Sequence, residues 1–188
     1  MKHSVASYNT KKNLSEALKK LLLTTDLDRI SITDLVREAG VNRKTFYYHF
    51  NDVYELISWT LRTEAMEKLM NFNILSDYRK GIKFVMDYVE KNQEIIINVA
   101  HSSAASQVRK LLCEGIRAPL TIAIGEIEDA RNEEFEPGFR DFLTEFFTEA
   151  IAGLIASWAQ DPNRRSRAHI ETYLTQIFDQ TASNLKQL

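Results

Sequence analysis

Basic and hydrogen-bonding side chains crowd into one short stretch of this 188-residue chain, Arg43-Lys44-Thr45-Phe46-Tyr47-Tyr48-His49. An arginine or lysine can donate to guanine O6 and N7 in the major groove of DNA, which discriminates between bases by about 1 to 3 kcal/mol. We assign base reading to Arg43 and Lys44, and packing on a thymine methyl group or a sugar to Tyr48. Contacts to phosphates are assigned to the other donors of the stretch, Thr45, Tyr47 and His49.

Charge is divided unevenly along the chain, although the formal net charge is only -2. Residues 1–50 hold nine Lys and Arg against five Asp and Glu, whereas the remaining 138 residues hold 15 against 21. A basic segment on an otherwise acidic chain indicates a part that binds a polyanion. Lys11 and Lys12 are expected to attract phosphates whatever the base sequence, and Thr33 to donate to a phosphate at the positive end of a helix.

The side chains that would contact DNA need rigid elements to position them. Ser31 followed by Asp34 fits a capping box that opens a helix, and Gly40 can take the left-handed conformation that ends one. The pattern predicts a short helix over residues 31–40 with a tight turn after it.

A second short helix is predicted directly after that turn. Asn42 is a favoured N-cap, and Val41 and Phe46 have the spacing of a hydrophobic staple around it. Phe50 continues the buried side, which leaves the basic and aromatic side chains exposed. A helix, a tight turn and a second helix with such a face form the pattern of a DNA-binding helix-turn-helix.

This stretch resembles the TetR/AcrR family of bacterial transcription regulators through the run Ile32-Thr33-Asp34-Leu35-Val36-Arg37-Glu38-Ala39-Gly40-Val41-Asn42-Arg43-Lys44-Thr45-Phe46-Tyr47-Tyr48-His49-Phe50. Within the family it is similar to a subgroup that includes dihydroxyacetone-responsive regulators. The resemblance implies an all-α chain with a DNA-binding domain at residues 1–50 and a helical ligand-binding and dimerisation domain at residues 51–188. It also implies a homodimer that binds an inverted-repeat operator under the control of a small-molecule effector. The chain departs from the family at Val53, where a lysine that contacts phosphate is common.

An effector site in the helical body is a further implication of the resemblance. The large side chains that could form its walls are Trp59, Met66, Phe84, Tyr88, His101 and Cys113. Aromatic and Met side chains at helical spacing fill protein cores in general, so none of these is assigned to a ligand.

Composition favours helices along the whole chain, because six Gly and three Pro leave few turns. Further helices are expected at about residues 53–70, 79–91, 94–100 and 104–130, where Pro119 could kink or divide the last of them. A single cysteine cannot form an internal disulfide, and the first residues lack the apolar stretch of a signal peptide. We expect a soluble, cytoplasmic protein without a membrane partner, since no run approaches the roughly 18 to 20 apolar residues of a membrane span.

Two apolar helical patterns near the end of the chain indicate an assembly. Residues 150–160 carry no charge, and a helix that is apolar nearly all round must be covered on two sides. We predict an antiparallel hairpin that packs on a second copy through Phe146, Ala150, Gly153, Leu154, Trp158, Tyr173, Ile177 and Phe178. The alternative is that both patterns line the core of one copy.

Two other classes of function stay open. The apolar hairpin could make the chain a protein-interaction module, and Cys113 with His101 could serve a helical enzyme as nucleophile and base. The four histidines are scattered and no metal or phosphate-loop spacing occurs, so no cofactor, metal or enzymatic activity is expected.

Overall fold

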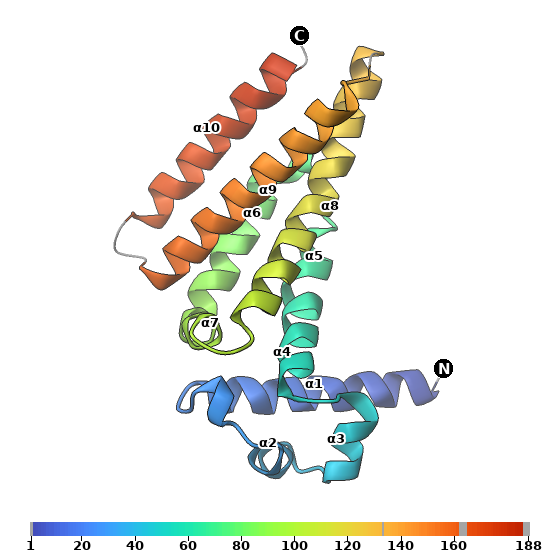
Figure 1. Ribbon diagram of the computed structural model, residues 1–188, viewed down its shortest axis with the longest axis vertical. Helices are drawn as coiled ribbons and strands as arrows, with labels where there is room; N and C mark the ends of the chain where they lie inside the picture. The colour runs from blue at the N-terminus through green and yellow to red at the C-terminus, as the bar shows by residue number, and fades with distance from the viewer. Residues whose placement is uncertain (1, 133, 162–164, 186–188) are drawn as a thin grey trace. The chain divides into compact units, whose positions relative to one another are not determined.

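The chain folds into helices wherever its secondary structure is defined. The computed structural model describes residues 2–132, 134–161 and 165–185 (Figure 1), and no strand occurs among them. In chain order the elements are α1 (Lys2–Leu22), the 3-10 turn η1 (Leu27–Arg29), α2 (Ile32–Ala39), α3 (Arg43–His49), α4 (Val53–Leu61), the π-helical turn η2 (Arg62–Met66), α5 (Glu67–Leu69), α6 (Ile74–Lys91), α7 (Gln93–Ala100), α8 (Ala105–Arg131), α9 (Pro137–Gln160) and α10 (Arg167–Leu185). The predicted all-α class is confirmed.

Contacts divide the chain into two compact units. The head unit comprises Met1–Glu64 and Asn92–Val108, and the body unit comprises Ala65–Lys91 and Arg109–Leu188. The head unit therefore contains α4 and α7 in addition to the predicted helix-turn-helix. The functional division between residues 50 and 51 stays a prediction.

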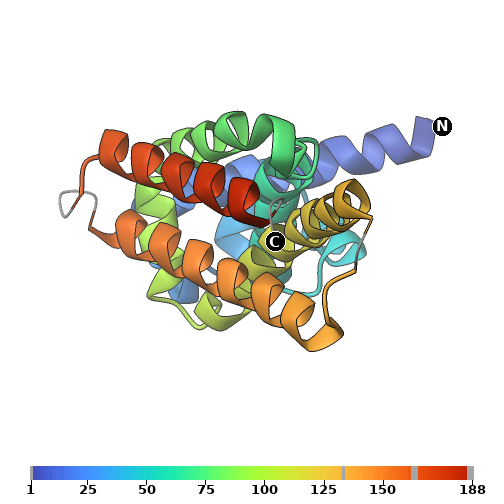
Figure 2. The same ribbon diagram turned by 90° about the horizontal axis from the view of Figure 1, so that it is seen from above.

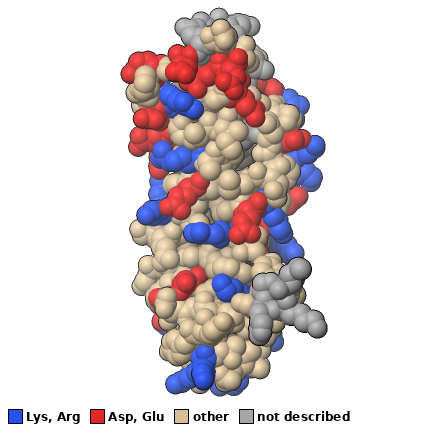
Figure 3. Space-filling model, turned by 90° about the vertical axis from the view of Figure 1, so that its right-hand side faces the viewer, with Lys and Arg blue, Asp and Glu red and all other residues tan. Residues whose placement is uncertain are grey.

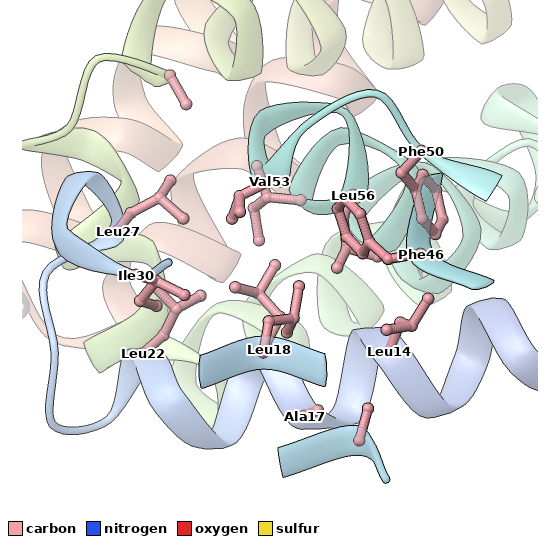
Figure 4. Packing of buried hydrophobic residues seen from close by; sticks show 14 of the residues in the cluster. Leu14, Ala17, Leu18, Leu22, Leu27, Ile30, Phe46, Phe50, Val53 and Leu56 are labelled. Atoms are coloured by element: carbon pink, nitrogen blue, oxygen red, sulfur yellow. The ribbon is translucent and has the colours of Figure 1, made fainter. Parts of the chain in front are cut away.

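The core of the head unit is built on one stripe of α1. Leu14, Leu18 and Leu22 are buried. Figure 4 shows Leu14 on the side of Phe46 and Leu56, and Leu22 beside Ile30 at the other end of the stripe. The stripe follows the spacing of three and four residues that places side chains on one helix face. Burial of this stripe holds α2, α3 and α4 against α1, and so fixes the position of the helix-turn-helix.

Asn98 ties α7 to the head unit through three hydrogen bonds. Its Nδ2 donates to the carbonyl oxygens of Leu22, at 2.9 Å, and Thr25, at 2.8 Å. Its Oδ1 accepts from the backbone N–H of Leu27 at 2.9 Å. One half-buried side chain thus satisfies three backbone groups, one in the last residue of α1 and two in the segment that follows it.

Asp28 makes a second tie to the segment after α7. Its carboxylate accepts the backbone N–H of Ser103 at 3.0 Å, the Ser103 hydroxyl at 3.1 Å and the Tyr54 hydroxyl at 3.0 Å. The Ser103 N–H is the main cause that lowers the pKa of Asp28. The carboxylate is therefore ionised at neutral pH, where it is the best acceptor for these donors.

One helix of the body unit, α6, departs in its start from the sequence expectation, whereas α8 has close to the expected bounds. α6 begins at Ile74 instead of near residue 79, because Asn73 Oδ1 accepts the backbone N–H groups of Leu75 and Ser76 at 2.8 and 2.9 Å. This cap satisfies donors that a helix start leaves open. α8 runs through Pro119 as one helix, so the proline does not divide it.

In the body unit α10 lies beside α6 and α9 (Figures 1 and 2). Arg167, in the first turn of α10, donates to Asp87 and Glu90 of α6, each at 2.6 Å. Further along, the rings of Tyr78 on α6 and Phe178 on α10 stack with centroids 5.5 Å apart. A planar guanidinium that engages two carboxylates fixes orientation as well as distance between the two helices.

α9 is long and apolar enough, by length and composition, to cross a membrane. The sequence expectation concerned an unbroken apolar run, which residues 137–160 do not form because Arg140, Asp141, Glu145 and Glu149 interrupt them. Core helices of globular domains meet the same measure. In α9 the side chains of Thr148, Ala152 and Trp158 are buried within the body unit.

A glycine gives Met66 its place in the body unit. A Cβ added at Gly115 of α8 would lie 2.2 Å from Met66 Sδ and 3.0 Å from its Cγ. We expect Gly115→Ala to destabilise the body unit by up to about 2 kcal/mol, because overpacking costs roughly 1 to 3 kcal/mol and helix propensity returns about 1 kcal/mol. In a Met66→Ala background the same change should stabilise by about 1 kcal/mol. A double-mutant cycle by urea denaturation measures the coupling, and strictly additive effects would contradict this close packing.

Candidate nucleic-acid interface

The turn between α2 and α3 has the predicted backbone geometry. Ser31 Oγ accepts the backbone N–H of Asp34 at the start of α2. Gly40 ends α2 with φ 65° and ψ 30°, and its N–H bonds back to the carbonyl oxygen of Arg37. This left-handed conformation favours glycine because it has no Cβ. The cap and the glycine together end one helix and aim the chain into the next.

α3 is held by its own cap and by the side that it buries. Asn42 Oδ1 accepts the N–H of Thr45 at 2.8 Å, and Val41 packs against the core of the head unit. Phe46 is fully buried and Phe50 is 3% exposed, with their ring centroids 6.1 Å apart. The residues predicted to anchor the second helix therefore do so.

The opposite side of α3 is exposed. Arg43 and Lys44 are exposed, as are Tyr47, at 56%, and Tyr48, at 81%. Thr45 and His49 are half-buried. Tyr47 is thus not a core aromatic, although its ring meets the edge of Phe46. Large exposed aromatic side chains beside two cations are unusual for a helix that only supports a core.

Two predicted DNA contacts from different helices meet at this surface. The Arg43 guanidinium donates to the hydroxyl oxygen of Thr33, which lies in the first turn of α2. Both side chains are exposed. The bond places the Arg43 guanidinium beside the N-terminus of α2, where partial positive charge favours an anion.

Lys11 lies against aromatic rings as well as near the predicted surface. Its ammonium is 5.4 Å from the ring centroid of Phe50 and 5.8 Å from that of Trp59. Burial, and then the charge of Lys11, lower the pKa of His49. At neutral pH the His49 imidazole is therefore uncharged, and would contact a phosphate as a neutral donor.

The cations of the head unit fall into paired and unpaired sets. Lys20 pairs with Glu38, Arg37 with Asp34. Among the described residues no carboxylate pairs with Lys12, Arg43 or Lys44. Figure 3 shows Lys and Arg side chains at the tip that carries α2 and α3, and Asp and Glu side chains around the connection between α8 and α9. Lys12, Arg43 and Lys44 are all among the residues predicted to contact DNA.

Val53, which stands where the family commonly has a lysine, is buried in the structure. The side chain is 8% exposed and belongs to the core of the head unit. Asp52 caps α4 immediately before it by accepting the N–H of Glu55 at 2.7 Å. The position therefore supplies core packing and no phosphate contact.

The residues predicted to form a dimer interface divide between surface and interior. Phe146, Tyr173 and Ile177 are 54, 52 and 49% exposed, and Ala150 is exposed. Gly153, Leu154 and Phe178 are half-buried. Trp158 is 5% exposed within the body unit, so its predicted place at the surface is wrong. A helix that is apolar nearly all round does not reveal from its sequence which side faces its own core.

The α9 surface is richer in aromatic side chains than the predicted set. Phe139 and Phe142 are 41 and 60% exposed, and the Phe142 ring stacks on that of Phe146 with centroids 6.1 Å apart. The spacing of three and four residues along α9 was the sequence signal for this surface.

The body unit contains an apolar cavity of about 70 Å³, here called the body cavity. Its walls come from α5 to α6 and from α8, α9 and α10: Leu69, Phe72, Tyr78, Gly81, Ile82, Val85, Met86, Ile116, Pro119, Ile151, Ile155, Leu174 and Phe178. None of the six candidate wall residues taken from the sequence lines it. Those candidates were chosen for size, whereas helix orientation decides which side chains reach a cavity.

The candidate nucleophile and base lie in different units. Cys113 belongs to the body unit and His101 to the head unit. Burial, and then the Glu149 carboxylate, raise the pKa of Cys113, whose thiol donates to Glu149 at 3.6 Å. A nucleophilic cysteine needs a lowered pKa, so these surroundings oppose that role. Among the described residues no group of His, Cys, Asp and Glu could hold a metal ion.

Known proteins share this fold. A solved structure, the dihydroxyacetone kinase operon activator DhaS, superposes with a TM-score of 0.75 at 17% identity, covering 93% of this chain and 96% of that one. NalD, the secondary repressor of the MexAB-OprM multidrug efflux pump in Pseudomonas aeruginosa, gives a TM-score of 0.65 at 17% identity with the same coverage. Identities this low show the fold alone.

Sequence relatives add to this likeness. The HTH-type dhaKLM operon transcriptional activator DhaS of Lactococcus lactis subsp. lactis (strain IL1403) is 32% identical over 87 residues, 45% of each chain. The chain spans about half the length of the curated relatives that it matches.

Family models match both units of the chain. Residues 14–58 match the model described as bacterial regulatory proteins, tetR family. Residues 76–180, more than half of the chain, match the model described as transcriptional regulator C-terminal region. The chain therefore belongs to the TetR family of bacterial transcriptional regulators.

Proposed function

We propose that this chain regulates transcription by binding double-stranded DNA as a homodimer under the control of a small-molecule effector. Residues 1–50 would form the DNA-binding domain, and residues 51–188 the regulatory and dimerisation domain. The protein would act in the cytoplasm, without a membrane partner and without enzymatic activity. A two-fold dimer presents two recognition helices to successive major grooves, so the operator would be an inverted repeat.

One observation carries the DNA-binding part of the proposal. α3 buries Phe46 and Phe50 while it exposes two unpaired cations and two tyrosines. Arg43 and Lys44 lie in its first turn. A helix that enters the major groove by its N-terminal end presents those first residues to base edges. Thr33 is hydrogen-bonded to Arg43, and Thr45 and His49 lie on the same helix as Arg43, so these three residues would act as phosphate donors.

Arg43→Ala is expected to relax base preference, and Lys12→Ala to weaken binding to all duplexes alike. Loss of a bidentate guanine contact should reduce the ratio of specific to non-specific affinity by about 10- to 100-fold. Loss of one phosphate contact should lower the slope of log affinity against log salt by about 0.9. Duplexes selected from a random pool, followed by gel-shift titration at several salt concentrations, measure both quantities.

Lys12 is the matched basic residue for this comparison because it is exposed, whereas Lys11 also packs on two rings. Lys11→Ala would change the packing of the head unit together with its charge. If Arg43→Ala selected the same duplexes as the parent with the same ratio, the assignment of α3 as the reading helix would be wrong.

The dimer part of the proposal is supported by the exposed aromatic side chains of α9 and by Tyr173 and Ile177 of α10. Apolar surface of this kind on neighbouring helices is typical of a surface that is covered in an assembly. Sedimentation equilibrium of Phe142→Glu, against Phe135→Glu in the α8–α9 connection, tests it. A parent chain that sediments as a monomer at micromolar concentration would contradict the proposal.

A protein-interaction module without DNA binding is the second candidate, and the same apolar surface favours it. The two candidates differ in their response to DNA. Sedimentation with and without a duplex pool at low salt separates them, since only the regulator would bind duplexes with a steep dependence on salt.

A further inference from the structure

Arg43 and Lys44, the two cations assigned to base reading, differ in how their side chains are held. The Arg43 guanidinium donates from Nη2 to Thr33 Oγ1. The part of the chain that the structure describes offers Lys44 no hydrogen-bond or ion-pair partner. Both cations are exposed, so burial fixes neither of them. The hydrogen bond to Thr33 is therefore what distinguishes Arg43 from Lys44.

The backbones on both sides of this hydrogen bond are fixed by helix caps. Thr33 lies in the first turn of α2, whose N-cap is Ser31. Arg43 is the first residue of α3, whose N-cap is Asn42. Each cap side chain accepts a backbone N–H of its own helix, at 3.2 Å for Ser31 and 2.8 Å for Asn42. The hydroxyl and the guanidinium thus meet from two capped helix starts.

We propose that Thr33 is a positioning residue that holds the Arg43 guanidinium for base reading, so that Arg43 and not Lys44 sets the base preference of the head unit. This inference rests on the proposed function for the binding of DNA, and on the hydrogen bond alone for the order of the side chain. The operator would then carry a guanine at one position of each half-site, where Arg43 reaches the base edge.

An arginine held by one hydrogen bond can still read a base. The guanidinium has five N–H donors in a planar fork, and the bond to Thr33 uses one of them. A guanine contact needs two donors on one edge of the fork, for O6 and N7. The fork has two such edges, so one of them stays open to a base while the other side is anchored.

Order in the Arg43 side chain before DNA binds favours the specific complex. A long side chain that becomes immobile only on binding costs about 0.5 to 1.5 kcal/mol, which is a factor of about 2 to 12 in affinity. Non-specific binding does not require an ordered guanidinium, so it does not carry this cost. The anchor therefore raises the ratio of specific to non-specific affinity by that factor.

Thr33→Val removes the hydroxyl and keeps a branched side chain, whereas Thr33→Ser keeps the hydroxyl. In gel-shift titrations, Thr33→Val should lower the affinity ratio between duplexes with and without the selected guanine by about 2- to 12-fold. Thr33→Ser should keep the parent ratio. A phosphate contact by Thr33 affects all duplexes alike, so it does not enter this ratio. An unchanged ratio in Thr33→Val would overturn the positioning role.

Two backgrounds show whether Thr33 acts through Arg43. In Arg43→Ala, which lacks the group that Thr33 holds, Thr33→Val should change the ratio no further. In Lys44→Ala, the matched control, Thr33→Val should lower the ratio as much as it does in the parent. A further fall in the Arg43→Ala background would show that Thr33 acts by another route, and would overturn the proposal.

The order of the Arg43 side chain is measured without DNA, so that the two proposals fail separately. Nitrogen-15 relaxation of Arg43 Nε in the full chain should give an order parameter that falls in Thr33→Val and is kept in Thr33→Ser. An Nε equally disordered in the parent and in Thr33→Val would overturn the positioning role, even in a chain that selects duplexes. An ordered Arg43 in a chain that selects no duplex would overturn the proposed function, and with it the reading of a base by Arg43.

Discussion

Phe46→Ala is expected to destabilise the head unit by about 3 to 5 kcal/mol and to abolish duplex binding at 37 °C. Phe46 is the largest fully buried side chain of the chain's described core, and Leu14 and Leu18 belong to the same cluster. A whole domain is stable by only about 5 to 15 kcal/mol, so this loss is a large fraction of the total. Urea denaturation measures the cost, and hydrogen exchange of amides in α1 to α3 shows whether it falls on the head unit.

Tyr48→Ala is the matched control on the same helix. Tyr48 is 81% exposed, so its removal should change stability by no more than about 0.5 kcal/mol while it weakens duplex binding. Phe46→Ala tests the side of α3 that stabilises the head unit, and Tyr48→Ala tests the side that we propose binds DNA. Loss of less than about 1 kcal/mol in Phe46→Ala would mean that α3 is not anchored as the structure shows.

The helix-turn-helix could be predicted from sequence because its determinants are local. The caps at Ser31 and Asn42 act within three residues, and Gly40 is needed at its own position. The staple joins Val41 to a residue five positions later. Interactions over such short separations leave a pattern that a single sequence displays.

The walls of the body cavity could not be predicted in the same way. They come from five helices, and which side chain of each helix reaches the cavity depends on the rotation of that helix. The prediction that Trp158 lies in a dimer interface was wrong for the same reason, since α9 is apolar on both its buried and its exposed sides. Periodicity identifies a face, but two apolar faces on one helix look alike.

The place of α7 in the head unit also left no local pattern. Asn98 bonds to Leu27 across 71 positions of sequence and to Leu22 across 76. An asparagine on an amphipathic helix is an ordinary polar residue until its partners are known. The composition of residues 94–100 predicted a helix, but not the unit to which it belongs.

Asn98→Ala is expected to destabilise the head unit by about 2 to 4 kcal/mol, because it leaves two carbonyl oxygens and one N–H group with fewer partners in a half-buried setting. The segment after α1 should then exchange its amide hydrogens faster than α3 does. Urea denaturation with hydrogen exchange of residues 22–30 measures both effects.

Asn13→Ala is the matched control for Asn98→Ala, because the Asn13 side chain makes one hydrogen bond within the described part of the chain, from Nδ2 to the carbonyl oxygen of Ala39 at 2.7 Å. Asn13→Ala should lower the free energy of unfolding by about 1 kcal/mol, because one hydrogen bond is lost. Equal losses in the two variants would contradict the three-way tie of Asn98. A loss about three times larger, with faster exchange confined to the segment after α1, would show that α7 supports the head unit through that one side chain.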